Sequence, residues 1–281
     1  MTFGQALPEE GEMRDLPVDG GMLRVRGVEL ACRQVGHGPP LLVLHGGSGP
    51  TPGASYLAAL AAHFTIILPT HPGFYGSPHH GRIRSVDDLA YLYLDLIDDY
   101  GLDGLTVMGF SMGGWLALEM ATKTCARLER LLLVDAVGVK FADRETRQFP
   151  DIFAQAQDAV ARLMFHDPAR MTPDFAALSE DELAAFVTNR EALIHYVWEP
   201  YLHNPNLLGR LHRVKVPVTC IWGDSDGLAT PNYGRQLAAA LPDARFELIR
   251  QAGHAPQLEQ PQAFVAAVLA ACGRQPARVE P

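Results

Sequence analysis

Short runs of apolar residues, each followed by a turn, constrain the fold of this chain more than any other feature. Residues 41–44 and 64–69 are apolar almost without interruption, and similar runs follow at 105–108 and 131–134. Continuous apolar strands are typical of a parallel sheet whose two faces are both covered by helices. The sequence therefore predicts an α/β fold with a mostly parallel sheet at its centre.

Helical patterns separate these predicted strands. Ser85 has the spacing of an N-cap, with Asp88 three residues later. Leu89, Leu92 and Leu96 then recur at helical period. Strands that alternate with helices in this way predict a doubly wound sheet with right-handed crossovers.

The alternation stops between residues 139 and 211, where helix-compatible stretches are separated by prolines, and it resumes at 216–222. We therefore predict a lead-in over residues 1–20 and a core over residues 21–138 and 212–281. A helical cap over residues 139–211 is expected as an insertion after the sixth strand. Because ligands of open α/β sheets bind at the carboxyl ends of the strands, the cap is expected to cover that edge.

The charge balance limits the partners that this chain can bind. It has 23 Lys and Arg against 32 Asp and Glu, a formal net charge of −9, and its basic residues form no stripe. Proteins that bind nucleic acid carry clusters of Lys and Arg that neutralise its phosphates. We therefore expect neither nucleic acid nor an anionic membrane as a partner. We expect a small-molecule substrate, and the sequence leaves open whether the chain forms a homo-oligomer.

The cysteines and the hydropathy indicate the cellular compartment in which the protein is expected. Cys32, Cys125, Cys220 and Cys272 are far apart and form no CxxC pair. Free thiols are the expected state, although spacing alone leaves two disulfides open. No signal-peptide pattern stands at the start, and no apolar run approaches the ~18 residues of a membrane span. We therefore expect a cytoplasmic protein.

The strongest chemical signal is Gly109-Phe110-Ser111-Met112-Gly113, between a predicted strand and a predicted helix. A serine hydroxyl can attack a carbonyl only if it protrudes from a tight turn, and small residues on both sides leave room for the crowded backbone. The start of the next helix brings backbone N–H groups to the oxyanion that forms. The pattern predicts Ser111 as a nucleophile.

Serine needs a base, and two later loops supply the partners. Asp224 and Asp226 follow the strand that ends at Ile221, and His254 follows the strand that ends near Ile249. These loops and the serine turn all fall at the same edge of the sheet. The sequence therefore predicts His254 as the general base, oriented by an acid.

In these motifs the chain resembles the α/β-hydrolase superfamily, from about residue 23 to residue 272. The matching pieces are Leu44-His45-Gly46-Gly47, the turn at Ser111, Trp222-Gly223-x-x-Asp226 and Gly253-His254-x-x-x-x-Glu259-x-Pro261. The resemblance implies an α/β-hydrolase fold with Asp226 as the acid. It also implies that the N–H groups of Gly47 and Met112 form the oxyanion hole, while His45 is structural. Asp224 and Asp135, which follows another strand, stay open as alternative acids.

The predicted cap is rich in aromatic and histidine side chains, most of which are expected to pack the cap onto the core. A few should line an apolar substrate pocket. We expect Trp198, His195 and Phe165 there first, together with Gly46 in the turn before Gly47.

Two other patterns suggest binding sites without completing one. His71, His79 and His80 share one loop, but no carboxylate or cysteine completes a metal site, so solvated loop histidines are expected. The glycine-rich turn at 46–49 lacks the lysine of a P-loop and the acid expected beyond a dinucleotide motif. We therefore expect neither a metal nor a cofactor.

The sequence thus predicts a serine hydrolase that cleaves a small to medium, mostly apolar ester or lactone by two-step acyl transfer. One alternative is a carbon–carbon bond hydrolase of the meta-cleavage type, which the chain resembles over residues 45–50 and 111–114. Ala255 and Pro256 stand where those enzymes carry an aromatic residue after the histidine. An alternative of another class is a non-catalytic ligand receptor on the same fold.

Overall fold

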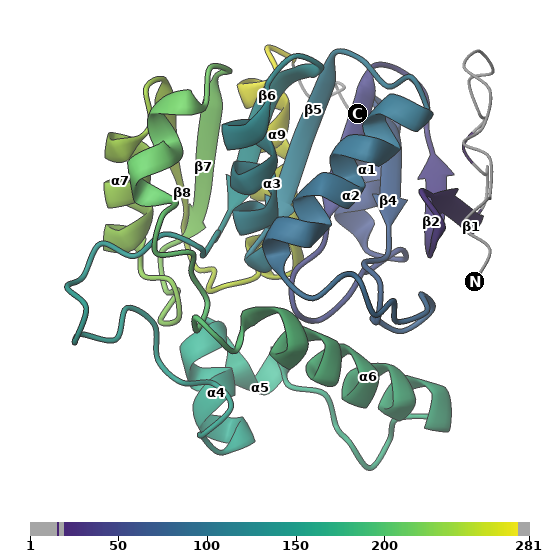
Figure 1. The fold of residues 1–281 in the computed structure, drawn as a ribbon. Coiled ribbons are helices and arrows are strands. Elements are labelled where there is room, and N and C mark those ends of the chain that lie inside the picture. The colour runs from purple at the N-terminus through teal and green to yellow at the C-terminus, as the bar shows by residue number, and fades with distance from the viewer. Residues whose placement is uncertain (1–15, 17–19, 275–281) are drawn as a thin grey trace, which may run out of the picture.

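A twisted sheet runs through the molecule (Figure 1). The computed structural model describes residue 16 and residues 20–274, and within them the sheet has eight strands in the order β1-β2-β4-β3-β5-β6-β7-β8. These are β1 (Gly21–Val25), β2 (Val28–Val35), β3 (Pro40–Leu44), β4 (Thr65–Pro69), β5 (Leu105–Phe110), β6 (Leu128–Val134), β7 (Val218–Gly223) and β8 (Ala244–Ile249). β2 pairs antiparallel with β1 and with β4, whereas every pairing from β4 to β8 is parallel. The mostly parallel sheet predicted from the sequence is confirmed.

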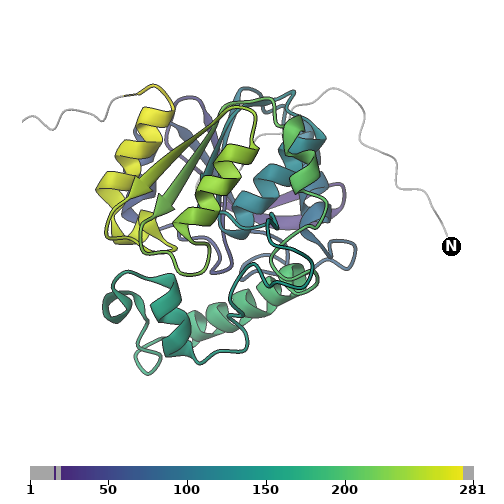
Figure 2. The ribbon, with the colours of Figure 1, turned by 90° about the vertical axis from the view of Figure 1, so that its left-hand side faces the viewer.

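Helices cover both faces of this sheet, as Figures 1 and 2 show. One face packs against α2 (Val86–Asp99), α3 (Met112–Lys123) and α7 (Pro231–Ala240). The other packs against α1 (Ser55–Ala61) and α9 (Pro261–Ala271), and α9 follows the short helix α8 (Pro256–Glu259). The sheet is therefore doubly wound, as predicted.

The strand β3 explains why the apolar runs are continuous. Leu42 and Leu44 belong to the core on the α2–α3 face, and Leu41 and Val43 belong to the core on the α1–α9 face. All four are at most 1% exposed. Successive side chains of a strand point to opposite faces, so both sets must be apolar when both faces are covered.

The segment between β6 and β7 contains no strand among the described residues. It forms α4 (Gln157–Met164), α5 (Pro168–Met171), α6 (Glu180–Val197) and the 3₁₀ helix η1 (Leu208–Arg213). Figures 1 and 2 place α4, α5 and α6 as a separate layer beside one edge of the sheet. The hydroxyl of Ser179 accepts the N–H of Glu182 at the start of α6, and the Glu182 carboxylate accepts the N–H of Ser179. This capping box fixes where the long cap helix begins.

Several local expectations can be compared directly with the structure. Ser85 caps α2 by accepting the N–H of Asp88, as its spacing predicts. All four cysteines are free thiols. Among the described residues, no helix combines the length and the apolar character needed to cross a membrane. The predicted lead-in over residues 1–20 lies almost entirely outside the described residues.

Candidate active site

Ser111 stands at a sharp turn between β5 and α3. Its backbone lies in the left-handed region, with φ 51° and ψ −113°, a conformation that costs free energy for a residue with a side chain. A Cβ atom at Gly109 would lie 2.2 Å from the carbonyl oxygen of Gly113, and one at Gly113 would lie 2.1 Å from that of Leu44. The backbone is therefore packed so tightly that only glycine fits at these two positions.

Two hydrogen bonds join Ser111 to the loops after β7 and β8. The hydroxyl of Ser111 donates to Nε2 of His254 over 2.9 Å, and the Nδ1–H of His254 donates to Oδ2 of Asp226 over 2.7 Å. Asp226 is 3% exposed and His254 is 8% exposed. In this tautomer Nε2 is free to take the serine proton while a carboxylate holds the other nitrogen. A serine nucleophile needs this arrangement of its base.

Of the three candidate acids, Asp226 is the one that hydrogen-bonds to His254. Its Oδ1 accepts two backbone N–H groups of its own loop at 2.8 and 3.0 Å, so the carboxylate is firmly placed. Asp224 is exposed, although it precedes Asp226 by only two residues. Asp135 is buried nearby and accepts the N–H of Gly223 at 3.0 Å.

A buried hydrogen-bond network holds the turn after β3. The Nδ1–H of His45 donates to the Gly46 carbonyl at 2.8 Å, and Nε2 of His45 accepts the N–H of His71 at 3.0 Å. The Nε2–H of His71 donates to the His45 carbonyl at 3.1 Å, and its Nδ1 accepts the hydroxyl of Tyr93 at 2.5 Å. Every ring nitrogen has one partner in the neutral form. Burial lowers the pKa of His45 to about 4 and the pKa of His71 well below its ordinary value.

This network fixes the orientation of the backbone N–H of Gly47. A peptide unit is planar, so a fixed Gly46 carbonyl also fixes the direction of the Gly47 N–H. The Gly46 carbonyl accepts hydrogen bonds from both His45 and the N–H of Gly49. Met112 is the first residue of α3, and the first N–H groups of a helix have no partner inside it. Both predicted oxyanion donors thus belong to rigid backbone.

Ser111 and His254 line a cavity of about 390 Å³ between the core and the cap. Gly46 and Phe165, which the sequence analysis expects in the substrate pocket, also line it, together with Gly47. The larger of the other apolar side chains come from core and cap alike, namely Val43, Tyr56, Leu68, Phe110, Ile152, Val160, Met164, Met171, Phe186, Leu193, Leu202, Leu228 and Leu258. A cavity of this volume with a mostly apolar lining suits an apolar ligand of modest size.

Two polar residues of α6 that the sequence analysis missed also line the cavity. Asn189 is 9% exposed, and its Nδ2 donates to the carbonyl of Ser48 at 2.8 Å. Arg190 donates to the carbonyl of Ile152 at 3.3 Å and brings a permanent positive charge to the wall. Their only sequence signal is their helical spacing from Phe186.

The structure corrects the expectation for Trp198 and His195, neither of which lines the cavity. Trp198 is 54% exposed and lies at the end of α6. The helix face that meets the cavity carries Phe186, Arg190 and Leu193, at the helical spacing of three to four residues. His195 is two positions from Leu193 and so lies on the opposite side of the helix. We expected Trp198 and His195 in the pocket because of their residue types. Which side chains of α6 line the cavity depends instead on the helix face that they occupy.

The expectation of a solvated loop histidine is wrong for His71. It is 0% exposed, and its ring centroid lies 3.8 Å from that of His45. His79 is exposed and His80 is intermediate, in agreement with the prediction. His71 stands two residues after the end of β4, and Thr70 between them is buried, so the chain is still in the interior when it reaches His71.

The cap segment at residues 163–167 is bonded to both loops that carry the partners of Ser111. The carbonyl of Leu163 accepts the N–H of Gly227 at 2.9 Å, and the carbonyl of Met164 accepts the N–H of His254 at 2.5 Å. The cap therefore shares backbone hydrogen bonds with the loops that carry Asp226 and His254.

Glu259 adds a third connection to the same segment. Its carboxylate accepts the N–H of Gly253 at 2.6 Å, that of His166 at 2.9 Å and that of Asp167 at 3.0 Å. Glu259 is 7% exposed. One buried carboxylate thus ties the histidine loop to the cap, and the hydrogen bonds compensate for its loss of hydration.

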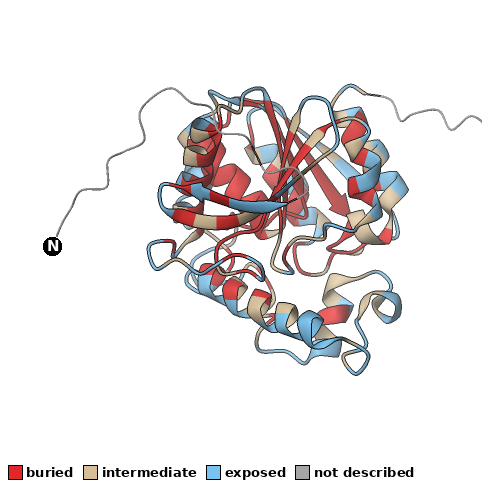
Figure 3. Cartoon of the chain, turned by 90° about the vertical axis from the view of Figure 1, so that its right-hand side faces the viewer, coloured by how far each residue is buried: buried red, intermediate tan, exposed pale blue. Residues whose placement is uncertain are grey.

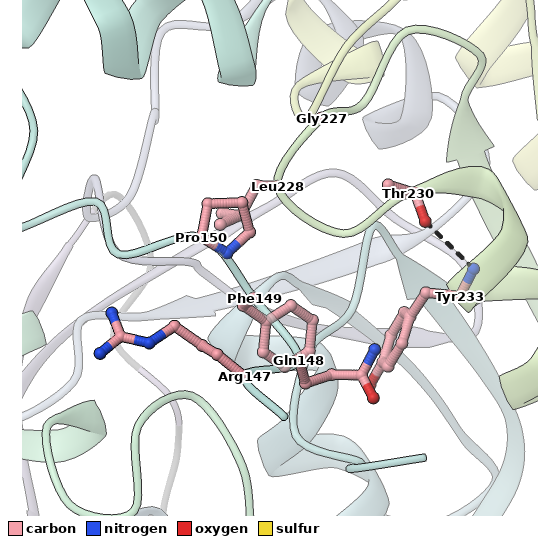
Figure 4. Close-up of a pocket in the computed structure, with 8 residues that line it drawn as sticks. All are labelled: Arg147, Gln148, Phe149, Pro150, Gly227, Leu228, Thr230 and Tyr233. Atoms are coloured by element: carbon pink, nitrogen blue, oxygen red, sulfur yellow. Dashed lines mark hydrogen bonds between the residues drawn. The ribbon is translucent and has the colours of Figure 1, made fainter. Parts of the chain in front are cut away.

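A second cavity has a volume of about 410 Å³, and Figure 4 shows the residues that line it. Its lining residues come from the chain after β6, from the loop before α7 and from the first turn of α7: Arg147, Gln148, Phe149, Pro150, Gly227, Leu228, Thr230 and Tyr233. Leu228 lines both cavities. Ser111 and His254 line the first cavity and not the second.

The chain is similar to several known proteins. The model of the Alpha/beta hydrolase family matches residues 41–268. A 2-hydroxy-6-oxononadienedioate/2-hydroxy-6-oxononatrienedioate hydrolase from Cupriavidus pinatubonensis is 25% identical, over 92% of this chain and 95% of its own length. A pimeloyl-[acyl-carrier protein] methyl ester esterase from Aromatoleum aromaticum is 30% identical, over 80% of this chain and 94% of its own length.

Solved structures give the same fold. A variant of the meta-cleavage product hydrolase CumD from Pseudomonas fluorescens has a TM-score of 0.75 at 20% identity, covering 90% of this chain and 97% of its own. An esterase from Thermogutta terrifontis has a TM-score of 0.68 at 22% identity, covering 88% of this chain and 96% of its own. At these identities the likeness shows the fold alone.

Proposed function

Since the chain belongs to the alpha/beta hydrolase family, we propose that it is a serine hydrolase that forms an acyl-enzyme on Ser111. Its substrate is a small to medium, mostly apolar ester or lactone. The observation that carries the proposal is the unbroken hydrogen-bond chain from Ser111 through His254 to Asp226, which begins in the wall of a mostly apolar cavity.

The reaction proceeds in two steps. Nε2 of His254 takes the proton of Ser111 as the hydroxyl attacks the substrate carbonyl, and Asp226 stabilises the imidazolium that forms. His254 then gives that proton to the leaving alkoxide. In the second step His254 activates a water molecule, which releases the acid and restores Ser111.

The N–H groups of Gly47 and Met112 hold the negative oxygen in both steps. A helix N-terminus favours an anion, so the first turn of α3 adds to this effect. The loss of one such donor typically lowers the rate by ~10²–10³-fold. The His45–His71 network therefore supports catalysis by keeping the peptide between Gly46 and Gly47 in one orientation.

Arg190 supports a second candidate function, a carbon–carbon bond hydrolase of the meta-cleavage type. It is a permanent cation in the wall of an otherwise mostly apolar cavity, and a substrate carboxylate would pair with it. The Cupriavidus pinatubonensis relative is by its name a hydrolase of dicarboxylates. The absence of an aromatic residue after His254, where Ala255 stands, argues for the ester or lactone.

A substrate panel tests these proposals. Wild-type protein is assayed with p-nitrophenyl esters of increasing acyl length, with lactones, and with vinylogous diketones that carry a carboxylate. A fluorophosphonate probe in parallel should label Ser111, and His254→Ala should abolish labelling. Turnover of esters or lactones with Ser111 labelling supports the first proposal, and a preference for the diketones supports the second. Ligand binding without turnover or labelling would contradict both and favour a receptor.

A further inference from the structure

Helix α6 of the cap lies directly against the turn that carries Gly47, one of the two proposed oxyanion donors. A Cβ atom at Gly47 would lie 2.4 Å from Cδ2 of Leu193. A Cβ atom at Gly49 would lie 2.5 Å from Nδ2 of Asn189. Gly49 also has a φ of 82°, in the left-handed region that favours glycine. The cap and this turn therefore pack so closely that a side chain at either glycine would collide with α6.

Asn189 joins α6 to two loops of the core. Its Nδ2 donates to the carbonyl of Ser48 at 2.8 Å, and its Oδ1 accepts the N–H of Tyr75 at 2.8 Å. A carbonyl can only accept and a backbone N–H can only donate, so these two partners fix the orientation of the amide group. Asn189 is 9% exposed. Both ends of a buried amide group are therefore bonded, and its position is fixed.

The Ser48 carbonyl is connected to the Gly47 N–H through two peptide units. The first unit contains the Ser48 carbonyl and the Gly49 N–H, and this N–H donates to the Gly46 carbonyl at 3.1 Å. The second unit contains the Gly46 carbonyl and the Gly47 N–H. Each unit is planar, so a carbonyl that is held also fixes the N–H of the same unit. A continuous chain of hydrogen bonds thus runs from the Asn189 amide to the peptide that carries the Gly47 N–H.

We propose that Asn189 is a positioning residue of the oxyanion hole, through which the cap completes the catalytic site of the core. The inference rests on the proposed function, in which the Gly47 N–H holds the negative oxygen. Asn189 acts through the turn, because it holds the Ser48 peptide, which in turn holds the Gly46 carbonyl. Each hydrogen bond of such a chain polarises the next, so Asn189 also makes the Gly47 N–H a stronger donor. His45 holds the same Gly46 carbonyl from the side of the core.

Asn189→Leu removes both hydrogen bonds of the amide and keeps a side chain of similar size. With p-nitrophenyl butyrate we expect kcat to fall at least about tenfold. The fall should be smaller than the ~10²–10³-fold loss of a whole donor, because His45 still holds the Gly46 carbonyl. KM should change less than about threefold, since the chain of bonds ends at the oxyanion and not at the bound ester.

Tyr196→Phe is the matched control on the same helix. It removes another buried hydrogen bond between α6 and the core, which the Tyr196 hydroxyl donates to the Pro72 carbonyl at 2.8 Å. This bond does not involve the turn at residues 46–49, so kcat and KM should stay within about threefold of wild type. If Asn189 only held the cap in place, the two variants would lose the same activity.

A transition-state analogue separates the oxyanion hole from the rest of the pocket. An alkyl trifluoromethyl ketone adds to Ser111: a carbon–oxygen bond forms, the serine proton passes to His254, and the ketone oxygen becomes the anion that the hole binds. The corresponding secondary alcohol has a similar shape and cannot form this adduct. Asn189→Leu should weaken inhibition by the ketone at least about tenfold and leave inhibition by the alcohol unchanged. An equal weakening of both inhibitors would show a general change of the pocket and would overturn the proposal.

Asn189→Asp is a second variant, and it also serves if Asn189→Leu does not fold. Its carboxylate still accepts the Tyr75 N–H and cannot donate to Ser48, so kcat should again fall at least about tenfold. Thr188→Asp adds the same charge at the neighbouring position of α6 and leaves Asn189 intact, so it is the control and should keep kcat within about threefold. A folded Asn189 variant with the same kcat as its control overturns the proposal.

These outcomes are distinct from a failure of the proposed function. If Ser111→Ala keeps wild-type turnover, the acyl-enzyme proposal fails, and this inference fails too. If Ser111→Ala is inactive and the folded Asn189 variants match their controls, the acyl-enzyme proposal stands and the role of Asn189 in the oxyanion hole is excluded.

Discussion

The α/β core and the cap reach the same cavity by different means. The core contributes Ser111, directly after β5, and Asp226 and His254, in the loops after β7 and β8. Every residue of β5 and β7 is buried. The cap contributes one face of α6, while its outer face is exposed (Figure 3). The core holds atoms in a fixed geometry, and the cap shapes the space above them. We therefore expect changes in the core to affect catalysis and changes in the cap, apart from Asn189, to affect substrate choice.

The largest effect is expected for the nucleophile. Ser111→Ala removes the attacking oxygen and should lower kcat/KM by about 10⁴-fold or more, with an unchanged melting temperature because the turn tolerates a smaller side chain. Steady-state kinetics and a melting curve measure the two effects. Ser55→Ala, on the exposed start of α1, is the control and should behave as wild type. Substantial residual activity in folded Ser111→Ala would remove Ser111 from its proposed role.

Glu259→Gln tests the connection between the two regions. An amide group cannot accept hydrogen bonds at both ends, so at least one of the three N–H groups around Glu259 loses its partner. A misplacement of about 1 Å at the histidine loop can cost about 10²-fold in kcat. Glu247→Gln, on the exposed side of β8, is the matched control. A loss confined to KM would show that the connection shapes only the cap.

Arg190→Met tests whether the cap affects substrate choice and leaves catalysis unchanged. Loss of a charged hydrogen-bond partner should raise KM at least about tenfold for substrates with a carboxylate, because such bonds contribute about 1.5–3 kcal/mol. Neutral esters should keep their kcat and KM. Arg162→Met changes a cap arginine that forms a surface ion pair with Asp158 and should change neither. An equal effect on neutral and charged substrates would contradict charge recognition by Arg190.

The smallest effect concerns the pH dependence of stability. His45 and His71 stay neutral in the folded chain, whereas the unfolded histidines bind protons below pH 6.5. The unfolded state thus binds more protons, and the free energy of unfolding falls as the pH falls from 6.5 towards about 4. Each histidine contributes up to about 1.4 kcal/mol per pH unit, a tenfold change in the unfolding equilibrium. Urea unfolding at several pH values measures the slope.

Asp135 contributes to this slope with the opposite sign. Its pKa is raised on folding, so the folded state keeps a proton that the unfolded state loses above the ordinary value. Asp135→Asn should therefore steepen the loss of stability on acidification. NMR titration gives a second readout, because His45 and His71 should stay neutral in the folded chain well below pH 6.5. An unchanged slope in Asp135→Asn would contradict a protonated Asp135.

Most of the fold could be predicted because its signals are local. The residues of β3 are apolar without interruption since both faces of the sheet are covered, and Ser85 caps α2 through its own neighbours. The serine turn is also local, because Gly109 and Gly113 are required by contacts within a few residues and with the adjacent strand. Patterns of this kind lie in consecutive residues and can be read without the tertiary structure.

Other features depend on contacts between distant segments and were decided only by the tertiary structure. His71 looks like a loop histidine, yet its burial against Tyr93 follows from how β4 and α2 pack. The cap shows the same limit, because the direction in which α6 crosses the sheet edge decides that Arg190 faces the cavity and Trp198 faces solvent. Sequence determined which residues can do chemistry, and packing between distant segments decided which of them meet.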